Sequence, residues 1–292
     1  MTLREALQNA EEHGRAIGHF NASDLSMIKA IAKVGKSFDV PIIVGVSEGE
    51  REFWGIKTIV ALINSLREEY ETDIFLNADH THSIEKIKEA TEAGFDAVLF
   101  DAGRLSLQEN IAQTRHVVEY VHQYNYKNGA DVLVEGELGY IGGSSVILEE
   151  IPKGADINES ELTSIDEARQ FVSETGVDML APAVGNIHGM FANTKNPAIY
   201  IERVSEIASN TGIPIVLHGG SGISDDQLIS AIHAGVRIIH ISTQLRFAWR
   251  RGLDLALLSH PKEIIPYKII PEVTRSVEKV VSDYVKLFMN AH

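Results

Sequence analysis

The sequence alternates short apolar runs with amphipathic stretches of helical period, and this alternation constrains the fold more than any other feature. Short apolar runs are typical of buried strands, and strands that are each followed by a helix indicate parallel βαβ units. Eight such units in one chain favour a closed (β/α)8 barrel, the TIM barrel, over an open sheet. The predicted strands lie at residues 16–20, 41–46, from 74 onward, 97–100, 132–134, 177–184, 213–217 and 236–241.

The helical patterns at the two ends of the chain are additions to this barrel. Residues 2–13 form the first amphipathic pattern, and residues 244–258 form the last. Hydrophobic residues make up 44% of the 292 residues, which is enough to bury a large core. No linker-like change in composition divides the chain, so we predict a single domain over residues 1–292.

The composition excludes several classes of partner and site. The net charge of −15 argues against nucleic acid or an anionic membrane as the main partner, although a local basic pocket for an anionic substrate is compatible with it. The chain has no cysteine, so a metal must use histidine and carboxylate ligands. The pattern at the start predicts an amphipathic helix, so we do not expect a signal peptide there, and no run approaches the ~18 apolar residues of a membrane span. We therefore expect a cytoplasmic protein with no membrane partner.

Polar side chains follow every predicted strand. In a TIM barrel the carboxyl ends of all strands meet at one rim, where the active sites of such barrels lie. A single polar residue is weak evidence, because a strand must end in something soluble, but together these residues predict a shared site. They are Asn21, Ser47, Asp79, His80, Asp101, Glu135, Glu137, His188, His218, His240 and Ser242.

Three of these residues form a candidate metal site. His80, His188 and His218 end three different strands, and three histidines with an open position are a known catalytic zinc arrangement. The alternative is three unrelated histidines, each hydrogen-bonded in its own loop. Spacing also leaves three rival ligands: His19, His82 and His240.

The carboxylate next to the first of these histidines is a candidate general acid or base. Asp79 directly precedes His80, and a carboxylate beside a metal ligand can transfer protons. The alternative is that Asp79 only places negative charge near the helix that Ser83 begins, which is common. The same two interpretations apply to three other carboxylates: Asp101, Glu135 and Glu137.

A glycine-rich turn predicts a phosphate site. Residues 218–222 read His-Gly-Gly-Ser-Gly, follow a predicted strand and precede a helix capped by Ser224. Backbone amides around Gly219 and Gly220 can hold a phosphate, and Ser242-Thr243 follows the eighth strand, where barrels often bind one. The alternative is an ordinary glycine-rich turn between strand and helix.

No lysine lies in or directly after a predicted strand. A lysine that forms a Schiff base normally projects from such a strand. Carbonyl chemistry at this rim would therefore need a metal as electron sink instead of an imine.

Five motifs in this order resemble those of the class II, zinc-dependent, fructose-bisphosphate and tagatose-bisphosphate aldolases. The resemblance covers nearly the whole chain, from residue 16 to about residue 258. The motifs are Asp79-His80; Leu99-Phe100-Asp101; Val134-Glu135-Gly136-Glu137-Leu138-Gly139 with Gly142-Gly143; His188-Gly189; and Leu217-His218-Gly219-Gly220-Ser221.

The resemblance implies a role for each matched residue. Asp79 corresponds to the catalytic acid or base, and Asp101 and Glu137 correspond to carboxylates near an alternative metal position. The implied zinc ligands are His80, His188 and His218. The substrate-binding set that we predict is Asn21, Gly189, Gly219, Gly220, Ser221, His240, Ser242 and Thr243. The family forms TIM barrels that are usually homodimers or homotetramers.

The function implied is cleavage of a ketose phosphate. Fructose 1,6-bisphosphate, split to dihydroxyacetone phosphate and glyceraldehyde 3-phosphate as in glycolysis, is the leading substrate. Tagatose 1,6-bisphosphate or a ketose 1-phosphate is the alternative. Two other functions are compatible with the residues: a metal-dependent barrel hydrolase, in which Asp79 would activate a metal-bound water, and a non-catalytic sugar-phosphate-binding protein.

Three departures from the family pattern concern the substrate and the second proton donor. His240 stands where the family usually has Asn. Residues 144–145 are serines where many members have an acid, so we expect Glu149 or Glu150 to protonate the enediolate carbon, unless both are solvated loop charges. Lys195 comes later than the lysine that often follows the second histidine ligand.

Overall fold

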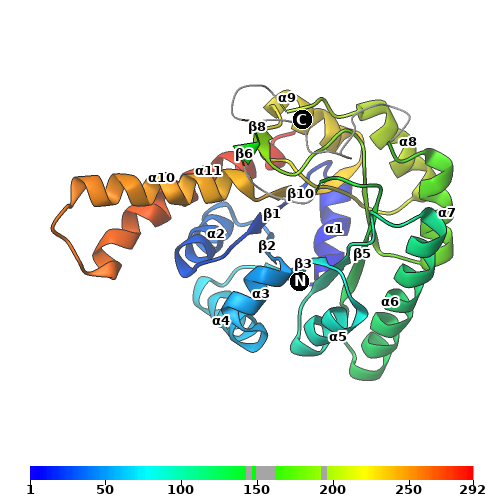
Figure 1. Cartoon of the computed structure of the whole chain (residues 1–292), viewed down its shortest axis with the longest axis horizontal. Helices are drawn as coiled ribbons and strands as arrows, with labels where there is room; N and C mark the ends of the chain where they lie inside the picture. The colour runs from blue at the N-terminus through cyan, green and yellow to red at the C-terminus, as the bar shows by residue number, and fades with distance from the viewer. Residues whose placement is uncertain (143–146, 149–161, 192–195, 292) are drawn as a thin grey trace.

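The computed structural model describes residues 1–142, 147–148, 162–191 and 196–291, and these contain a closed barrel of parallel strands (Figure 1). The strand order around the barrel is β1-β10-β9-β7-β5-β4-β3-β2, so the first and last strands close it. This confirms the predicted TIM barrel. The barrel strands are β1 (Ile17–Asn21), β2 (Ile42–Val46), β3 (Ile74–Thr81), β4 (Ala97–Phe100), β5 (Leu133–Leu138), β7 (Met179–Pro182), β9 (Ile215–Leu217) and β10 (Val236–Ile241).

Helices surround the barrel and connect successive strands. Several begin at a serine whose hydroxyl accepts a hydrogen bond from the first turn, as Ser83, Ser106 and Ser164 do. The connecting helices are α2 (Leu25–Phe38), α3 (Glu48–Trp54), α4 (Ile56–Tyr70), α5 (Ile84–Ala93), α6 (Leu107–Asn128), α7 (Ile165–Thr175), α8 (Ile201–Thr211) and α9 (Asp225–His233). None of the helices in the described ranges is long and apolar enough to cross a membrane.

The inside of the barrel is apolar at its amino end. Inward side chains such as Ile17, Phe75, Leu133 and Ile238 form one buried cluster there. Helix α1 (Leu3–Glu12), which was predicted before the first strand, closes this end of the barrel with a buried apolar face. The apolar plug leaves the carboxyl end as the end of the barrel that can hold polar groups.

The C-terminal helices α10 (Thr243–Ser259) and α11 (Pro266–Met289) form a long hairpin that extends beyond the barrel in Figure 1. The base of α11 packs against α10 and α2. The sequence predicted α10 but assigned nothing after residue 258. At the outer end of the hairpin, Leu258, Ile264 and Tyr267 are exposed.

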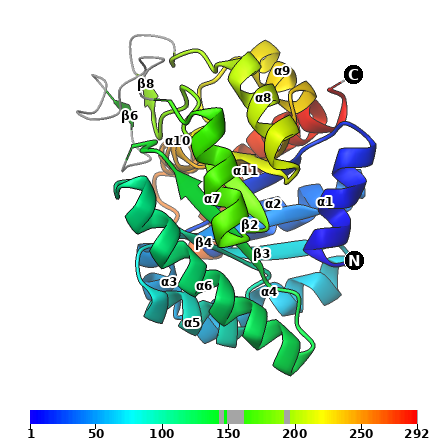
Figure 2. The ribbon, with the colours of Figure 1, turned by 90° about the vertical axis from the view of Figure 1, so that its right-hand side faces the viewer.

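A second, two-stranded sheet lies to one side of the barrel and pairs β6 (Ile147–Leu148) with β8 (Met190–Phe191) (Figure 2). These short strands belong to the connections that follow β5 and β7. Glu149 and Glu150, the predicted second proton donors, lie outside the described residues. The prediction for them therefore stays a prediction.

Candidate active site

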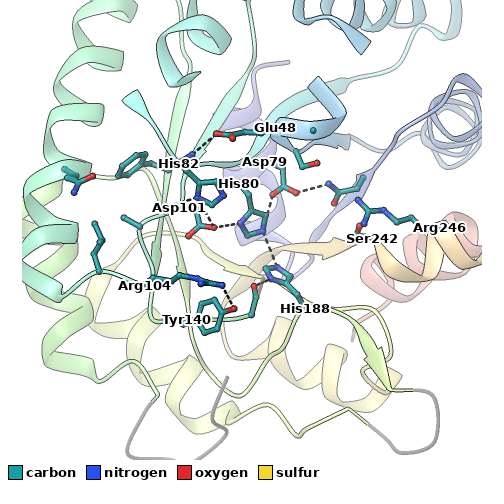
Figure 3. A pocket seen from close by; sticks show the side chains of 18 residues that line it. Glu48, Asp79, His80, His82, Asp101, Arg104, Tyr140, His188, Ser242 and Arg246 are labelled. Atoms are coloured by element: carbon teal, nitrogen blue, oxygen red, sulfur yellow. Dashed lines mark hydrogen bonds and ion pairs between the residues drawn. The ribbon is translucent and has the colours of Figure 1, made fainter. Parts of the chain in front are cut away.

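An irregularity at the end of β3 presents Asp79 and His80 together. Neighbouring residues of a regular strand point to opposite faces. Here the pairing of β3 with β4 shifts between Ala78 and Thr81, and His80 has a positive φ of 40°. Such a bulge turns the strand locally, so both side chains point into the pocket in Figure 3.

A buried arginine stabilises this bulge through hydrogen bonds to the strand. The Arg51 guanidinium donates to the backbone carbonyl of Asp79 at 3.0 Å and to the Thr81 hydroxyl at 2.9 Å. Arg51 lies on α3, whose start is marked in the sequence by a capping box, Ser47 with Glu50. That capping signal was available in the sequence, but the helix and its arginine were not predicted.

The three predicted histidine ligands converge at one point. Nε2 of His188 lies 3.3 Å from Nε2 of His80 and 3.2 Å from Nδ1 of His218. A tetrahedral zinc with Zn–N bonds of ~2.0–2.1 Å separates two ligand nitrogens by roughly 3.3–3.4 Å. The observed separations therefore fit a zinc ion held by these three nitrogens.

The remaining nitrogen of each histidine is held by an acceptor. Nδ1 of His80 donates to Asp101 at 2.8 Å, and Nδ1 of His188 donates to the Gly142 carbonyl at 2.7 Å. Nε2 of His218 donates to the carboxylate of Glu135 at 2.8 Å. These bonds fix which nitrogen of each ring carries the proton, so the other nitrogen offers its lone pair to a metal.

The neighbouring carboxylates favour the protonated, positively charged form of His80. Burial alone lowers the pKa of the His80 imidazole. Three neighbouring carboxylates outweigh burial and raise this pKa to about 10; they belong to Asp79, Asp101 and Glu137. Burial, followed by the charge on His80, lowers the pKa of His188 to about 4. In the metal-free protein the His80 proton contributes stability that is fully present below pH 6.5 and is lost as the pH rises through about 10.

His80 also belongs to a second cluster, which contains the two carboxylates that the resemblance places near an alternative metal position. His80, Asp101 and Glu137 each offer a ligand atom within 4.8 Å of the others. Burial and the charge of Asp101 raise the pKa of Glu137 well above its usual range. His82, a rival ligand in the sequence, is exposed at the rim and does not join either cluster.

The other histidine clusters are poor metal sites because their rings are stacked. The rings of His19 and His240 lie 3.4 Å apart and are nearly parallel, with an interplanar angle of 4°. A histidine lone pair lies in the plane of its ring, so two parallel stacked rings cannot direct lone pairs at one ion. The rings of His218 and His240 are also stacked, 3.9 Å apart with an interplanar angle of 30°.

Asp79 is placed to accept a proton. Its Oδ2 accepts a hydrogen bond from Asn21 at 2.8 Å, and its Oδ1 lies 3.5 Å from Nδ1 of His240. Burial raises the pKa of Asp79, but the positive charge of His80, followed by His240, outweighs burial and holds this pKa well below its usual range. Ser83 caps α5, as the sequence indicates, and the Asp79 carboxylate lies among the side chains of Asn21, His80 and His240.

A small cavity next to the histidines brings together most of the predicted substrate-binding residues. Ser221 Oγ accepts from the amides of Ser242 and Gln244 at the start of α10. Gly220 does not line this cavity, and its N–H is already used, since it donates to the carbonyl of His240. The lining residues include Asn21, Gly189, Gly219, Ser221, His240, Ser242 and Thr243. The positive end of the α10 helix dipole lies at this cavity and favours negative charge there.

A larger cavity of about 730 Å³ opens from the same histidines (Figure 3). Arg104 and Tyr140 form one wall: the guanidinium lies 4.4 Å from the centre of the Tyr140 ring and donates to its hydroxyl. Arg246 lines the opposite part and pairs with Glu50 at 2.9 Å. Arg104 and Tyr140 were not predicted from the sequence, because neither directly ends a strand.

Comparison with known proteins identifies the family. A family model described as fructose-bisphosphate aldolase class-II matches residues 1–292. The chain belongs to the class II fructose-bisphosphate aldolase family. As a class II aldolase it is a carbon–carbon lyase, and this family is generally metal-dependent.

Individual relatives of this class II aldolase agree with that assignment. A fructose-bisphosphate aldolase from Staphylococcus aureus is 33% identical, over 99% of this chain and 96% of the relative. A 6-phospho-5-dehydro-2-deoxy-D-gluconate aldolase from Shouchella clausii is 34% identical, over 97% and 92%. The crystal structure of the YdjI aldolase from Escherichia coli superimposes with a TM-score of 0.81 at 26% identity, covering 98% of this chain and 96% of that one.

We expect zinc binding to this aldolase to release a proton. His80 is protonated in the metal-free protein near neutral pH but must be neutral as a ligand, so affinity should weaken as the pH falls. Calorimetric titration of metal-free protein near pH 7.5, in two buffers of different ionisation enthalpy, should give about one zinc and about one released proton per chain. His188→Ala should abolish tight binding. Tight binding without proton release would contradict this account.

Replacement of Asp79 tests its role in proton transfer. Asp79→Asn preserves the size of the side chain but removes its basicity. We expect an aldolase that still binds zinc and retains its fold, with kcat lowered by a factor of ~10² to 10⁴. Steady-state kinetics with metal analysis of the same sample measures both quantities. A near-normal rate would remove Asp79 from the mechanism.

Proposed function

We propose that this protein is a zinc-dependent aldolase that cleaves fructose 1,6-bisphosphate to dihydroxyacetone phosphate and glyceraldehyde 3-phosphate, and forms it in reverse. The observation that carries the proposal is the convergence of three histidine nitrogens beside the ionised Asp79, next to a small cavity lined by serine and threonine hydroxyl groups. Tagatose 1,6-bisphosphate and ketose 1-phosphates are the alternative substrates.

The residues of the site divide the work of cleavage. A zinc ion bound here would polarise the ketone carbonyl of the substrate. Asp79 accepts the proton of the C4 hydroxyl as the C3–C4 bond breaks, which leaves the aldehyde and the enediolate of dihydroxyacetone phosphate. An acid then protonates C3 of the enediolate, and we assign this step to Glu149 or Glu150. Asn21 holds the Asp79 carboxylate in place through its 2.8 Å hydrogen bond.

The small cavity is the proposed site for the phosphate of the ketone half. Its hydroxyl groups come from Ser221, Ser242 and Thr243, and the amino end of α10 adds a favourable dipole. Gly219 has a φ of +67°, and a Cβ there would lie 2.3 Å from the carbonyl oxygen of Ile187. A glycine is therefore needed for the turn to pass this close to the site.

The large cavity is the proposed site for the aldehyde half. Arg104 is a cation on its wall, and in the described part of the chain it contacts Tyr140 but forms no ion pair with a carboxylate. A guanidinium can bind a phosphate through two parallel hydrogen bonds. Arg104 therefore supports a substrate with a second anionic group, as in a bisphosphate.

The rival functions are less well supported. Membership of an aldolase family favours carbon–carbon cleavage over hydrolysis, and the buried, ionised Asp79 favours catalysis over simple binding. The relative named 6-phospho-5-dehydro-2-deoxy-D-gluconate aldolase makes a different phosphorylated substrate an alternative for this chain. The roles in glycolysis and in the cytoplasm stay predictions.

We also propose that the chain forms a homodimer or homotetramer. The outer end of the α10–α11 hairpin exposes Leu258, Ile264 and Tyr267, whose exposed fractions are 77%, 87% and 74%. Large apolar side chains grouped on a projecting element are typical of a protein interface. A second copy of the chain is the partner that the family resemblance implies.

The substrate proposal predicts a selective effect at Arg104. Arg104→Ala should raise KM for fructose 1,6-bisphosphate about tenfold or more, because a charge-assisted contact is lost, and leave KM for fructose 1-phosphate unchanged. Arg169→Ala, at an exposed arginine on α7, is the matched control. A coupled assay for triose phosphate release measures both substrates. Equal losses on the two substrates would remove Arg104 from recognition, and absence of cleavage in the unmodified protein would refute the proposed substrate.

The assembly proposal predicts that charge at the hairpin tip weakens association. Leu258→Asp combined with Ile264→Asp should reduce the sedimentation coefficient of the native protein to that of a smaller species. Tyr126→Asp, at an exposed aromatic residue on α6, controls for added surface charge. A monomeric unmodified protein, or an unchanged coefficient in the double variant, would contradict an interface at the tip.

A further inference from the structure

His19 and His240 form a stacked pair in the barrel beneath the proposed active site. They are direct neighbours on β1 and β10, the strands that close the barrel. Their rings lie 3.4 Å apart at an angle of 4°, and the His240 ring also stacks on His218 at 3.9 Å. His240 thus lies between a buried histidine and a proposed metal ligand.

The packing around His19 fixes its ring. His19 is fully buried, and its Nε2 lies 3.2 Å from the side-chain nitrogen of Asn77. A Cβ at Gly45 would lie 2.0 Å from Cε1 of His19, so a glycine on the neighbouring strand makes room for the ring. His19 is therefore held in one position by its contact with Asn77 and by the space that Gly45 leaves.

His240 of this pair lies next to Asp79, the proposed base. Nδ1 of His240 lies 3.5 Å from Oδ1 of Asp79, while Asn21 holds the other oxygen at 2.8 Å. Both oxygens of the carboxylate therefore face a nitrogen of a neighbouring side chain. Because the stacked rings cannot share a metal ion, the arrangement suits orientation of the carboxylate instead of metal binding.

We propose that His19 is a positioning residue, which acts through His240 to hold the Asp79 carboxylate in the orientation for proton transfer. The amide of an asparagine would be smaller than this imidazole. The ring of His240 instead needs a flat surface on each side, which His19 and His218 provide. This inference rests on the proposed aldolase mechanism, in which Asp79 is the base.

A double-mutant cycle on His19 and His240 tests the proposal. We expect His19→Ala to lower kcat for fructose 1,6-bisphosphate about tenfold, with KM and zinc content within about twofold of the unmodified values. In the His240→Asn background the same change should cost less than about twofold, because an amide does not need the stacking surface. An equal loss in both backgrounds would mean that His19 only fills space, and would overturn the proposal.

Ile17→Ala is the matched control. Ile17 lies one layer deeper on the same strand, with its side chain buried inside the barrel. It should lower the melting temperature as His19→Ala does but leave kcat unchanged. If His19→Ala does not fold, Asn77→Ala, which removes the hydrogen bond to the His19 ring, takes its place in the cycle with the same criterion.

A second readout does not depend on catalysis. Long-range ¹H–¹⁵N spectra of the metal-free protein report the tautomer of each histidine ring. The His240 ring should show a single tautomer with Nδ1 protonated, and should lose it in His19→Ala but not in Ile17→Ala. Unaltered His240 signals in His19→Ala would overturn the proposal. If the unmodified protein does not cleave the sugar, only the proposed function fails, since these spectra still test the contact.

Discussion

The buried carboxylates at the carboxyl end of the barrel are the constraint on which the site depends. Asp79, Glu135 and Glu137 are nearly inaccessible to solvent, and Asp101 is only partly exposed. Buried negative charges are costly unless a cation or a proton compensates them. In the metal-free protein, protonation of His80 and the raised pKa of Glu135, about 8 through burial and repulsion from Asp79, provide that compensation. A divalent ion between the three histidines would supply the same positive charge permanently.

The fold meets this constraint with two features of its backbone and packing. The apolar plug, made by α1 and the inward side chains of the strands, confines the polar groups to one end of the barrel. The bulge at Asp79 and His80 then directs two consecutive side chains to the same side. The buried Arg51 of α3 stabilises this bulge through its hydrogen bond to the backbone carbonyl of Asp79. A positive φ at His80 has an energetic cost, and such costs are typical of functional sites.

The sequence predicts much of this arrangement and leaves identifiable parts out. Strand ends can be located from apolar runs, so the convergence of His80, His188 and His218 was expected. The stacking of His19 on His240 depends on closure of the first strand against the last, which no local pattern encodes. Helix α11 was missed: Pro266 stands at its first position, where proline is favoured, but Pro271 lies inside it, where a proline normally breaks a helix. The hydrogen bond from His218 to Glu135 depends on side-chain geometry. The sequence therefore identified Glu135 as a candidate site residue but did not predict which residue it contacts.

The most direct test of this account is the position of the metal itself. Anomalous diffraction at the zinc edge, from crystals of the native protein, locates the ion without reference to activity. The account predicts one strong peak about 2.0–2.1 Å from Nε2 of His80, Nε2 of His188 and Nδ1 of His218. A peak held only by His80, Asp101 and Glu137, or fully loaded protein with no peak between the three histidines, would contradict it.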